Sequence, residues 1–415
     1  MRHASLWKGL LRVEQGVLER MEYDSETDTL IFDVRLDRRA GVRCGRCRSP
    51  AVGYDQGRAR PRCWRGLDVV STRVLLRARV PRVRCPEHGV TAAAVPWARH
   101  GSRFTRAFED TLAWLATRAA KTTIAALMRT SWRSVGQAVT RVVAELDAAG
   151  AEGDRLVGLS RIGIDEVSYR RGHKYLTVVV DHDTGRLVFA GDGRTKKTLG
   201  EFFNALGEKG CANLELVSCD GADWIAELVG LRAPQARLCL DPFHVIATAQ
   251  RALDKIRTGA AREARRRGNQ AASRALYRAR FALWKNPDDH TDAQAAKLAW
   301  VAAEHDKVHK AWQLKEHLRA VFAAGGAEGL ALLDTWYRLA ETSGLPAFTD
   351  YARRLRRFRN DIANTLHAGL ANARVEGTNT VIRLLTRVAF GFHSPEPLIA
   401  LAKLRVGGYH LALPR

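Results

Sequence analysis

Four residues near the N-terminus have the types and spacing of a metal site. Cys44 and Cys47 form a CxxC pair, and Cys85 and His88 form a CxxH pair. Two intervening residues let both side chains of a pair reach one tetrahedral ion, and three cysteines with one histidine are a common structural zinc set. Cys63 is a further candidate ligand, but it has no partner two or three residues away. The sequence therefore predicts one structural Zn²⁺ at these four residues, with unrelated cysteines as the alternative.

A second set of candidates consists of acids that follow strand-like runs. Residues 161–181, RIGIDEVSYRRGHKYLTVVVD, alternate apolar and polar side chains around Asp165 and then repeat a strand pattern after an Arg-Arg-Gly tip. A third strand-like run covers 186–190. Helical and strand patterns then alternate up to Asp241, and the strand LELVSC ends immediately before Asp220.

This order, β-β-β-α-β-α-β-α, predicts a mixed sheet flanked by helices, because strands joined through helices pair in parallel. It is the order of the ribonuclease-H-like fold, in which the fourth strand lies beside the first. Asp165 and Asp220 are then expected to meet across the sheet. Asp223 and Asp241 are alternatives for the second acid, and Asp241 is expected to position the following helix and His244.

A third acid lies late in the chain, in the segment NARVEGTNTVIRLLTRVAFGF from Asn372. On a helix, Glu376, Asn379 and Arg383 would share one face, because residues three, four and seven apart lie together. A carboxylate, an amide and a guanidinium would then point the same way. On its own, Glu376 would be interpreted as a surface residue. The two aspartates at strand ends favour a functional role for it.

The elements before the sheet indicate a DNA-binding unit. From Ser102 the pattern is helical, and a short helix from Thr122 precedes a longer one from Trp132 to Leu146. This arrangement is typical of a helix-turn-helix. The alternative is an ordinary three-helix packing unit. The third helix would present four polar residues to a DNA major groove, namely Arg133, Ser134, Gln137 and Arg141.

Composition favours a polyanionic partner. The 415 residues carry a formal net charge of +23, and such an excess of Lys and Arg most often indicates nucleic acid. A membrane surface is the rival partner, but no apolar run approaches the length of a spanning helix, and the first residues lack the apolar region of a signal peptide. We expect no membrane association and a cytoplasmic, nucleoid-associated protein with reduced cysteines.

After Asp241 more than a hundred residues have helical spacing and no strand signal, which predicts a long helical insertion. Its first third is basic, and phosphate contact and a solvated helix face are equally good interpretations. The candidate phosphate contacts are Arg251, Lys255, Arg262 and Arg265. The tryptophans of the insertion are expected in its core rather than as base-stacking platforms; they are Trp284, Trp300, Trp312 and Trp336.

Together these motifs resemble a DDE transposase of bacterial insertion sequences, of the ISL3 (ISL-three) family. The resemblance runs nearly end to end through the cysteine pairs, the helix-turn-helix, IGIDE, VSCDGA, DPFHV and NARVEGTN. It implies that Asp165, Asp220 and Glu376 form the catalytic triad and hold Mg²⁺ (or Mn²⁺) for phosphoryl transfer. Asp241, His244, Asn379 and Arg383 would support them. The sequence departs from the expected pattern at Cys219 and Gly221 and at 372–374, without loss of an acid.

The implied function is binding of the terminal inverted repeats of the element, followed by DNA cleavage and strand transfer into target DNA, with a homodimer in the DNA complex. Two alternatives are a transposase-derived regulator without catalysis and a ribonuclease-H-like nuclease without strand joining. The expected multidomain α/β chain comprises a β-rich N-terminal segment, a zinc-binding β module, a helix-turn-helix, the first part of the catalytic core, a helical insertion and closing helices. Their boundaries are 1–40, 41–98, 99–152, 158–250, 251–370 and 371–415.

Overall fold

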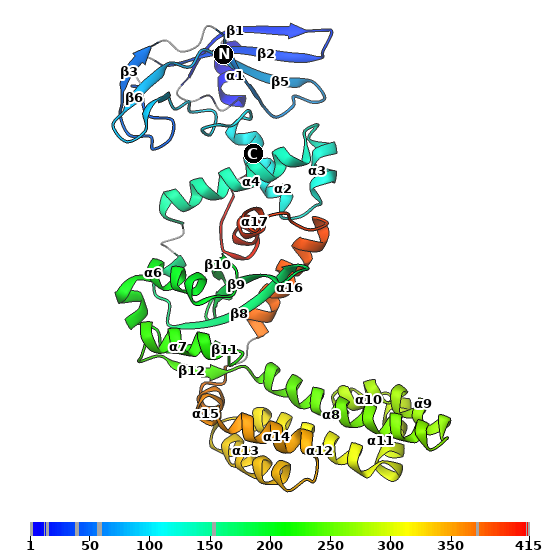
Figure 1. Ribbon diagram of the computed structural model, residues 1–415. Helices are drawn as coiled ribbons and strands as arrows, with labels where there is room; N and C mark the ends of the chain where they lie inside the picture. The colour runs from blue at the N-terminus through cyan, green and yellow to red at the C-terminus, as the bar shows by residue number, and fades with distance from the viewer. Residues whose placement is uncertain are drawn as a thin grey trace. The chain divides into compact units, whose positions relative to one another are not determined.

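The computed structural model describes residues 3–11, 13, 16–37, 41–55, 60–151, 155–370, 373–411 and 413 (Figure 1). Contacts between residues divide the chain into two compact units. The first comprises Met1–Arg155 with Ile382–Arg415, and the second comprises Leu156–Val381. Among the described residues, no helix combines the length and the apolar character that crossing a membrane requires.

The first unit opens with a helix and a four-stranded sheet of order β1-β2-β5-β4. Phe32, Val74 and Leu76 are fully buried in its core, where inward-facing side chains alternate with outward-facing ones. The sequence predicted a β-rich segment here but not the helix. The elements are α1 (His3–Leu10), β1 (Gly16–Asp24), β2 (Thr29–Leu36), β4 (Arg62–Arg65) and β5 (Arg73–Ala78).

A second, three-stranded sheet of order β3-β6-β7 carries the metal knuckles. Its strands are β3 (Val52–Asp55), β6 (Arg82–Cys85) and β7 (Gly89–Ala92). The strand-like run VVSTRVLLRARVPRVR at 69–84 predicts one strand pair, as in a zinc ribbon, and this prediction is wrong. The run does form β5 and β6, but β5 pairs with β2 and β4, whereas β6 pairs with β3 and β7. Residues 79–81 connect the two strands and belong to neither sheet, and Pro81 has no N–H to donate to a ladder.

Three helices follow at the expected places. Thr105 caps α2 by accepting from Phe108 N, and Ser131 caps α4 by accepting from Ser134 N, which satisfies donors that a helix start leaves free. Val135, Val139 and Val142 bury one face of α4. The last helix of the chain packs against α4, where Lys403 Nζ lies 2.8 Å from Asp147 Oδ2. The bounds are α2 (Arg106–Ala116), α3 (Lys121–Leu127), α4 (Trp132–Leu146), η2 (Asp147–Ala151) and α17 (Glu396–Val406).

The second unit contains a five-stranded mixed sheet of order β10-β9-β8-β11-β12. β8 pairs antiparallel with β9 and parallel with β11, so the fourth strand of this sheet lies beside the first, as predicted. Helices α6 and α7 pack on this sheet through Phe202, Phe203 and Ile225, which share a core with the strand residues Ile162, Val179 and Val217. The elements are β8 (Arg161–Arg170), β9 (Lys174–Asp181), β10 (Leu187–Asp192), α6 (Lys196–Ala212), β11 (Leu216–Cys219), α7 (Asp223–Arg232) and β12 (Arg237–Leu240).

The predicted helical insertion follows β12, and the residues described from 242 to 370 contain no strand. Its first helix, α8, begins at Pro242 and runs unbroken to Arg266, so the insertion starts inside a helix of the sheet domain. The other elements are α9 (Gln270–Arg278), α10 (Arg280–Trp284), η3 (Pro287–Asp289), α11 (Asp292–Glu304), α12 (Asp306–Ala324), α13 (Gly326–Glu341), α14 (Pro346–Arg356) and α15 (Arg359–Ala368).

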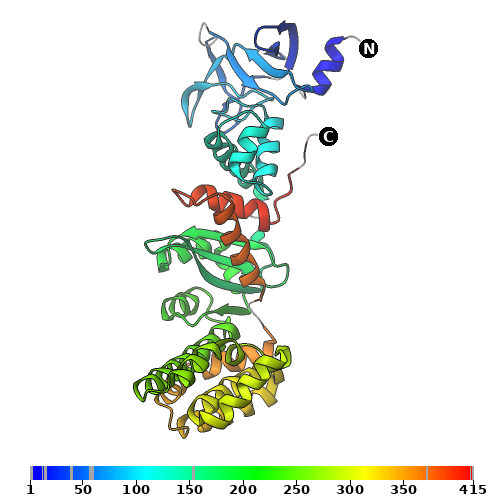
Figure 2. The same cartoon turned by 90° about the vertical axis from the view of Figure 1, so that its right-hand side faces the viewer.

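The insertion returns to the sheet through α15. Thr365 Oγ1 donates to Leu240 O at 2.8 Å, and Asn364 Nδ2 donates to Leu238 O at 2.9 Å. Helix α16 (Ala373–Val388) then crosses the sheet, as the red-orange helix beside the green strands of Figure 2 shows, and its Asn379 contacts Asp165 on β8. Trp336 is fully buried in the core of the insertion, as predicted; Trp300 and Trp312 pack partly buried against that core.

Candidate active site and metal centre

The four predicted metal ligands lie together. The ligand atoms of Cys44, Cys47, Cys85 and His88 are all within 4.8 Å of one another. Cys47 Sγ lies 3.7 Å from Cys85 Sγ, and His88 Nδ1 lies 3.7 Å from Cys85 Sγ and 3.9 Å from Cys44 Sγ. Zinc–sulfur bonds of about 2.3 Å give a tetrahedron with edges of about 3.8 Å. The spacing therefore fits one tetrahedral Zn²⁺, whereas Cys63 is exposed on β4, outside the group.

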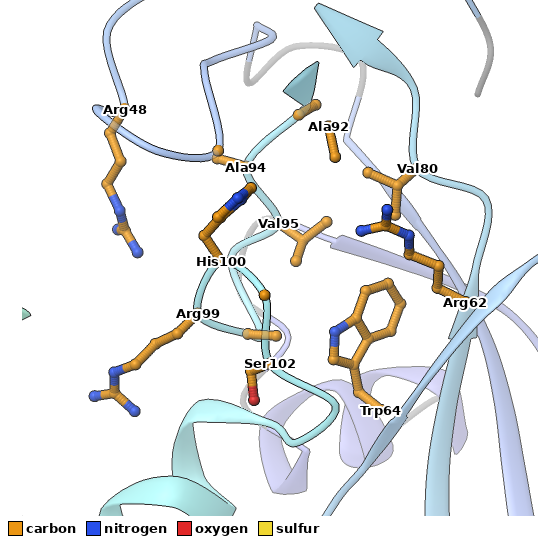
Figure 3. Close-up of a pocket in the computed structure, with 14 residues that line it drawn as sticks. Arg48, Arg62, Trp64, Val80, Ala92, Ala94, Val95, Arg99, His100 and Ser102 are labelled. Atoms are coloured by element: carbon orange, nitrogen blue, oxygen red, sulfur yellow. The ribbon is translucent and has the colours of Figure 1, made fainter. Parts of the chain in front are cut away.

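A small cavity of about 30 Å³ lies beside the first knuckle. Figure 3 shows Arg62, Trp64 and His100 around it. Gly45, the second residue of the knuckle, donates its N–H to Ala92 O at 3.1 Å, and a Cβ there would lie 2.7 Å from His100 Nδ1. Burial and nearby cations lower the pKa of His100, which keeps the imidazole neutral. Only glycine fits this close approach of knuckle and imidazole.

Asp165 lies on β8 just past the point where β11 stops pairing with that strand, because the last paired residue is Gly163. Its Oδ1 accepts from Glu166 N at 2.7 Å, and its Oδ2 accepts from Asn379 Nδ2 at 2.6 Å. Burial raises the pKa of Asp165, and the charge of Asp220 raises it further. The groups around this half-buried carboxylate therefore do not fully offset its negative charge when it is ionised.

Asp220 follows β11 directly and is exposed at the same edge. Its Oδ1 accepts from Ala222 N at 3.1 Å, forming a local turn. Gly221 has φ +85°, and a Cβ there would meet Leu240 at 2.8 Å. Glycine after the aspartate, one of the departures from the expected pattern, is thus required by the turn itself.

Asp241 and His244 complete this edge. Asp241 is 2% exposed and caps α8 by accepting from Phe243 N at 3.1 Å, while its Oδ2 lies 2.7 Å from His244 Nδ1. The hydrogen bond to Asp241 raises the pKa of His244, and the charges of Asp165 and Asp220 raise it further. The His244 imidazole therefore lies in the negative electrostatic field of both acids. Asp223, the other alternative for the second acid, is exposed and pairs with Arg357 at 3.3 Å.

Glu376, the third predicted acid, lies in α16. Gly163 lets this helix approach β8, because a Cβ there would lie 2.4 Å from Val375 Cγ2. Glu376 is half-buried, one helical turn before the buried Asn379, or about 4.5 Å along the helix axis. Within the described ranges, however, the only group of three or more potential ligands within 4.8 Å is the cysteine–histidine set. The structure thus brings Asp165, Asp220 and His244 to one edge, and Glu376 onto the neighbouring helix.

Glu166 was not singled out by the sequence reasoning. Burial raises its pKa, followed by the charge of Asp220, and Arg194 lies 3.7 Å from its carboxylate. The Asp-Glu doublet in IGIDE was the sequence signal for Glu166. Strand alternation argued against it, because consecutive side chains lie on opposite faces of a sheet. Glu166 therefore adds to the negative field at this edge of the sheet.

The residues predicted to read DNA differ in their surroundings. Arg133 and Gln137 are exposed on α4, and Ser134 is half-buried and hydrogen-bonded with Ser131. Arg141 instead donates to the fully buried Glu109 at 2.7 Å, so its guanidinium takes part in an internal ion pair. Trp132, exposed at the start of α4, was not among the predicted contacts.

The basic residues of the insertion also differ in their exposure to solvent. The four candidate phosphate contacts are exposed, at Arg251, Lys255, Arg262 and Arg265. Arg257, by contrast, is 3% exposed; it pairs with Asp254 at 2.7 Å and donates to Leu276 O at 3.0 Å. Its role is therefore structural. Arg383 is exposed on α16.

A paired-knuckle metal site, a helix-turn-helix and a sheet of this order with acids at the ends of β8 and β11 define a DDE-type transposase. Comparison with known proteins agrees. Residues 162–402 match the transposase family model of the ISL3 type, residues 93–143 match the helix-turn-helix domain of transposase family ISL3, and residues 40–88 match the zinc-finger of transposase IS204/IS1001/IS1096/IS1165. The chain belongs to the ISL3 family of DDE transposases, and the match supports structural zinc at its four-residue group.

Two relatives cover most of the chain. The transposase for insertion sequence element IS1557 of Mycobacterium tuberculosis is 47% identical over 438 residues, covering 100% of this chain and 98% of that protein. The transposase for insertion sequence element IS1001 of Bordetella parapertussis is 26% identical over 366 residues, covering 88% of this chain and 86% of that protein. The chain is therefore an enzyme of DNA transposition, and its helix-turn-helix implies DNA binding.

Proposed function

We propose that this transposase binds the terminal inverted repeats of its insertion sequence and catalyses Mg²⁺-dependent cleavage and strand transfer at Asp165, Asp220 and Glu376. The observation that carries the proposal is that Asp165 and Asp220 lie at one edge of the sheet, where the charge of Asp220 adds to burial in raising the pKa of Asp165. Two carboxylates placed beside each other without compensating cations are costly. They are retained where a cation or a reaction needs them.

The donor set fits a hard divalent cation, since carboxylate oxygens are the ligands that Mg²⁺ and Mn²⁺ prefer. Asp165, Asp220 and Glu376 would hold it. When bound, such ions lower the pKa of an attacking water or hydroxyl and offset charge on the leaving oxygen. Glu376 is proposed to reach the two aspartates from α16, because Asn379, one helical turn further along that helix, contacts Asp165.

The surrounding residues of the chain position this cluster. Asn379 and the Glu166 N–H each donate to one oxygen of Asp165, and each oxygen keeps a further lone pair for a cation. Asp241 accepts a hydrogen bond from His244 Nδ1, which favours a proton on Nδ1 and leaves Nε2 as the nitrogen that gains or loses a proton. When Nε2 is also protonated, His244 supplies a donor and positive charge beside the two acids. Arg383, further along α16, is proposed to contact DNA phosphate.

The DNA is proposed to be recognised by residues 1–150, with Arg133, Ser134 and Gln137 on the exposed side of α4 reading base edges. Arg141 is retained as a candidate contact that would have to leave Glu109. Sequence-independent phosphate contacts come from the insertion, at Arg251, Lys255, Arg262 and Arg265. Two copies of the chain, one at each end of the element, would form the active complex, acting in the cytoplasm on nucleoid DNA.

The test is an in vitro cleavage and strand-transfer assay on DNA that carries the repeats flanking the gene. Asp165→Asn, Asp220→Asn and Glu376→Gln should each abolish both reactions and leave repeat binding close to wild type, because the amides keep shape and lose a ligand charge. Asp241→Asn should be milder. Cleavage without joining by the wild type would favour a nuclease, and binding without either reaction would favour a regulator.

A further inference from the structure

A cleft leaves the acidic edge of the sheet and follows one face of α8. Near the edge, a cavity of about 380 Å³ is lined by Asp220, His244 and Arg251, among others. A second cavity of about 690 Å³ is also lined by His244 and Arg251 and extends to Thr258 and to Trp284 on α10. The two cavities are adjacent, because both are lined by His244 and Arg251. We treat them together as one cleft, here named the α8 cleft, with the candidate catalytic acid Asp220 at one end.

The lining of the α8 cleft is a regular stripe of α8. Its residues recur at spacings of three and four, which places them on one face of the helix. From His244 to Thr258 this stripe is about 21 Å long at 1.5 Å per residue. The lining residues of α8 in the larger cavity are Phe243, His244, Ala247, Gln250, Arg251, Asp254, Lys255 and Thr258. The cleft is thus an elongated track along α8.

The track is cationic. Arg251 and Lys255 are exposed, and Arg280 joins them from α10. Among the described residues, none of these three cations forms an ion pair with a carboxylate, whereas the cleft's own Asp254 is neutralised by Arg257 at 2.7 Å. The charge that remains beyond Asp220 is positive, which suits a phosphodiester backbone.

The track also holds aromatic surface at both ends. Phe243, in the first turn of α8, is 54% exposed although it lies next to His244. At the far end the Arg280 guanidinium lies 3.8 Å above the Trp284 ring. Phe281 does not line either cavity, but it is 64% exposed and meets Trp284 edge to face. Aromatic surface is therefore open to a ligand at both ends of the cleft. Phe243 and the Arg280–Trp284 pair are suited to stack on bases.

From this combination we propose that the α8 cleft binds unpaired nucleotides of the DNA strand that runs away from the reacting phosphate. This rests on the proposed function, because it takes Asp220 as part of the catalytic site. Base stacking requires bases that are not already stacked in a duplex, whereas phosphates alone would need only the cations. Cleavage and joining leave single-stranded nucleotides next to the reacting phosphate, and the cleft offers them a place contiguous with Asp220. Trp284, expected from the sequence to be a core residue, is then a binding residue at the border of the core.

The test measures binding of a fluorescently labelled oligothymidine and of a duplex of equal length to the full chain, without Mg²⁺. Phe243→Ala combined with Phe281→Ala should weaken oligothymidine binding about tenfold or more, since a stacking contact contributes about 1–3 kcal/mol. Duplex binding should change less than about twofold. Arg280→Gln, which keeps every ring, should also weaken the single strand selectively, through loss of the guanidinium stack.

Two matched controls lie outside the α8 cleft. Phe390→Ala removes another exposed ring and should change neither affinity, and Arg265→Gln removes an exposed cation of α8 and should weaken both ligands equally. Equal losses for single strand and duplex in the Phe243/Phe281 variant, or no loss at all, would overturn the proposal. Because binding needs no cleavage, the two ideas are tested separately on the wild-type chain: selective single-strand binding without any cleavage or joining would sink the proposed catalytic function alone.

Discussion

Asn379 and Asp165, 214 residues apart in the chain, are joined by a 2.6 Å hydrogen bond from Nδ2 to Oδ2. The amide is 1% exposed, and its Oδ1 has no hydrogen-bond partner among the described residues. A buried polar acceptor without a partner costs free energy. The pair therefore joins the late helix to the first strand at the expense of stability, which is typical of a functional position.

The first prediction concerns this pair. Asn379→Asp should slow DNA cleavage more than Asn379→Ala, because a second carboxylate would repel Asp165, whereas alanine only removes a donor. Asn379→Ala should change the free energy of unfolding by no more than about 1 kcal/mol, since the unpaired Oδ1 is removed with the donor. Cleavage rates and urea denaturation measure the two effects, with exposed Thr380→Ala on the same helix as control. An equal rate for the two Asn379 variants would show that the amide does not act on Asp165.

The second prediction concerns the approach of α16 to β8. Gly163→Ala should destabilise the chain by about 1–3 kcal/mol through overpacking, because the added Cβ lies 2.4 Å from Val375 Cγ2 and 2.8 Å from His182 Nε2. Cleavage should fall with it, since α16 carries Glu376. Adding Val375→Ala should recover part of both losses. Gly200→Ala, in a helix and with open space around it, is the matched control and should not destabilise.

A third prediction follows from the raised pKa of Asp165. Because the folded state holds this proton more firmly than the unfolded chain does, the ionised carboxylate costs stability that grows as pH rises above the ordinary value of 3.8. Asp165→Asn should therefore be more stable than wild type at neutral pH without metal, and the difference should shrink toward pH 4. Added Mg²⁺ should raise the melting temperature of wild type and not of the variant. A stability difference that is independent of pH would contradict the burial argument.

The order of strands and helices along the chain could be predicted because apolar periodicity switches cleanly between two and three-to-four residues from 161 to 241. The placement of the fourth strand beside the first followed from the resemblance of that order to the ribonuclease-H-like fold. The zinc ligands were equally accessible, since two-residue gaps are a local signal. The pairing of strands that lie far apart in the chain could not be predicted in this way. The β patterns of β5 and β6 predict strands but not their partners, and pairing is decided by packing of distant side chains such as Phe32 and Val83. Domain boundaries remain predictions.

The sequence also did not show which charged side chains form internal ion pairs. Arg141 and Gln137 sit one turn apart on the predicted recognition helix, yet burial of Glu109 draws Arg141 inward. Arg251 and Arg257 are likewise both arginines of one basic run, but only Arg257 is buried. Charge density along a helix therefore identified a basic surface without identifying which of its members reach solvent.

The fourth prediction is that Cys44→Ser with Cys47→Ser removes zinc and unfolds the β3-β6-β7 sheet, because metal binding supplies folding free energy in small β modules. Elemental analysis should give one zinc per chain for wild type and close to none for the variant. Cys63→Ser should keep its zinc, since this cysteine is exposed outside the ligand group. Loss of zinc on replacing Cys63 would instead make it a ligand.

The last prediction separates reading of DNA from packing on α4. Arg141→Ala should lower the free energy of unfolding by about 1.5–3 kcal/mol, because it removes a charged hydrogen bond from Glu109, whose carboxylate is fully buried. The loss is limited because Arg99 and Ser102 still contact that carboxylate. Gln137→Ala should leave stability within about 0.5 kcal/mol and reduce discrimination between terminal repeats and unrelated DNA by about 1–3 kcal/mol. Competition binding at fixed salt, beside denaturant melts, measures both. An Arg141 variant as stable as wild type that loses discrimination would show that this guanidinium leaves Glu109 to read the repeat.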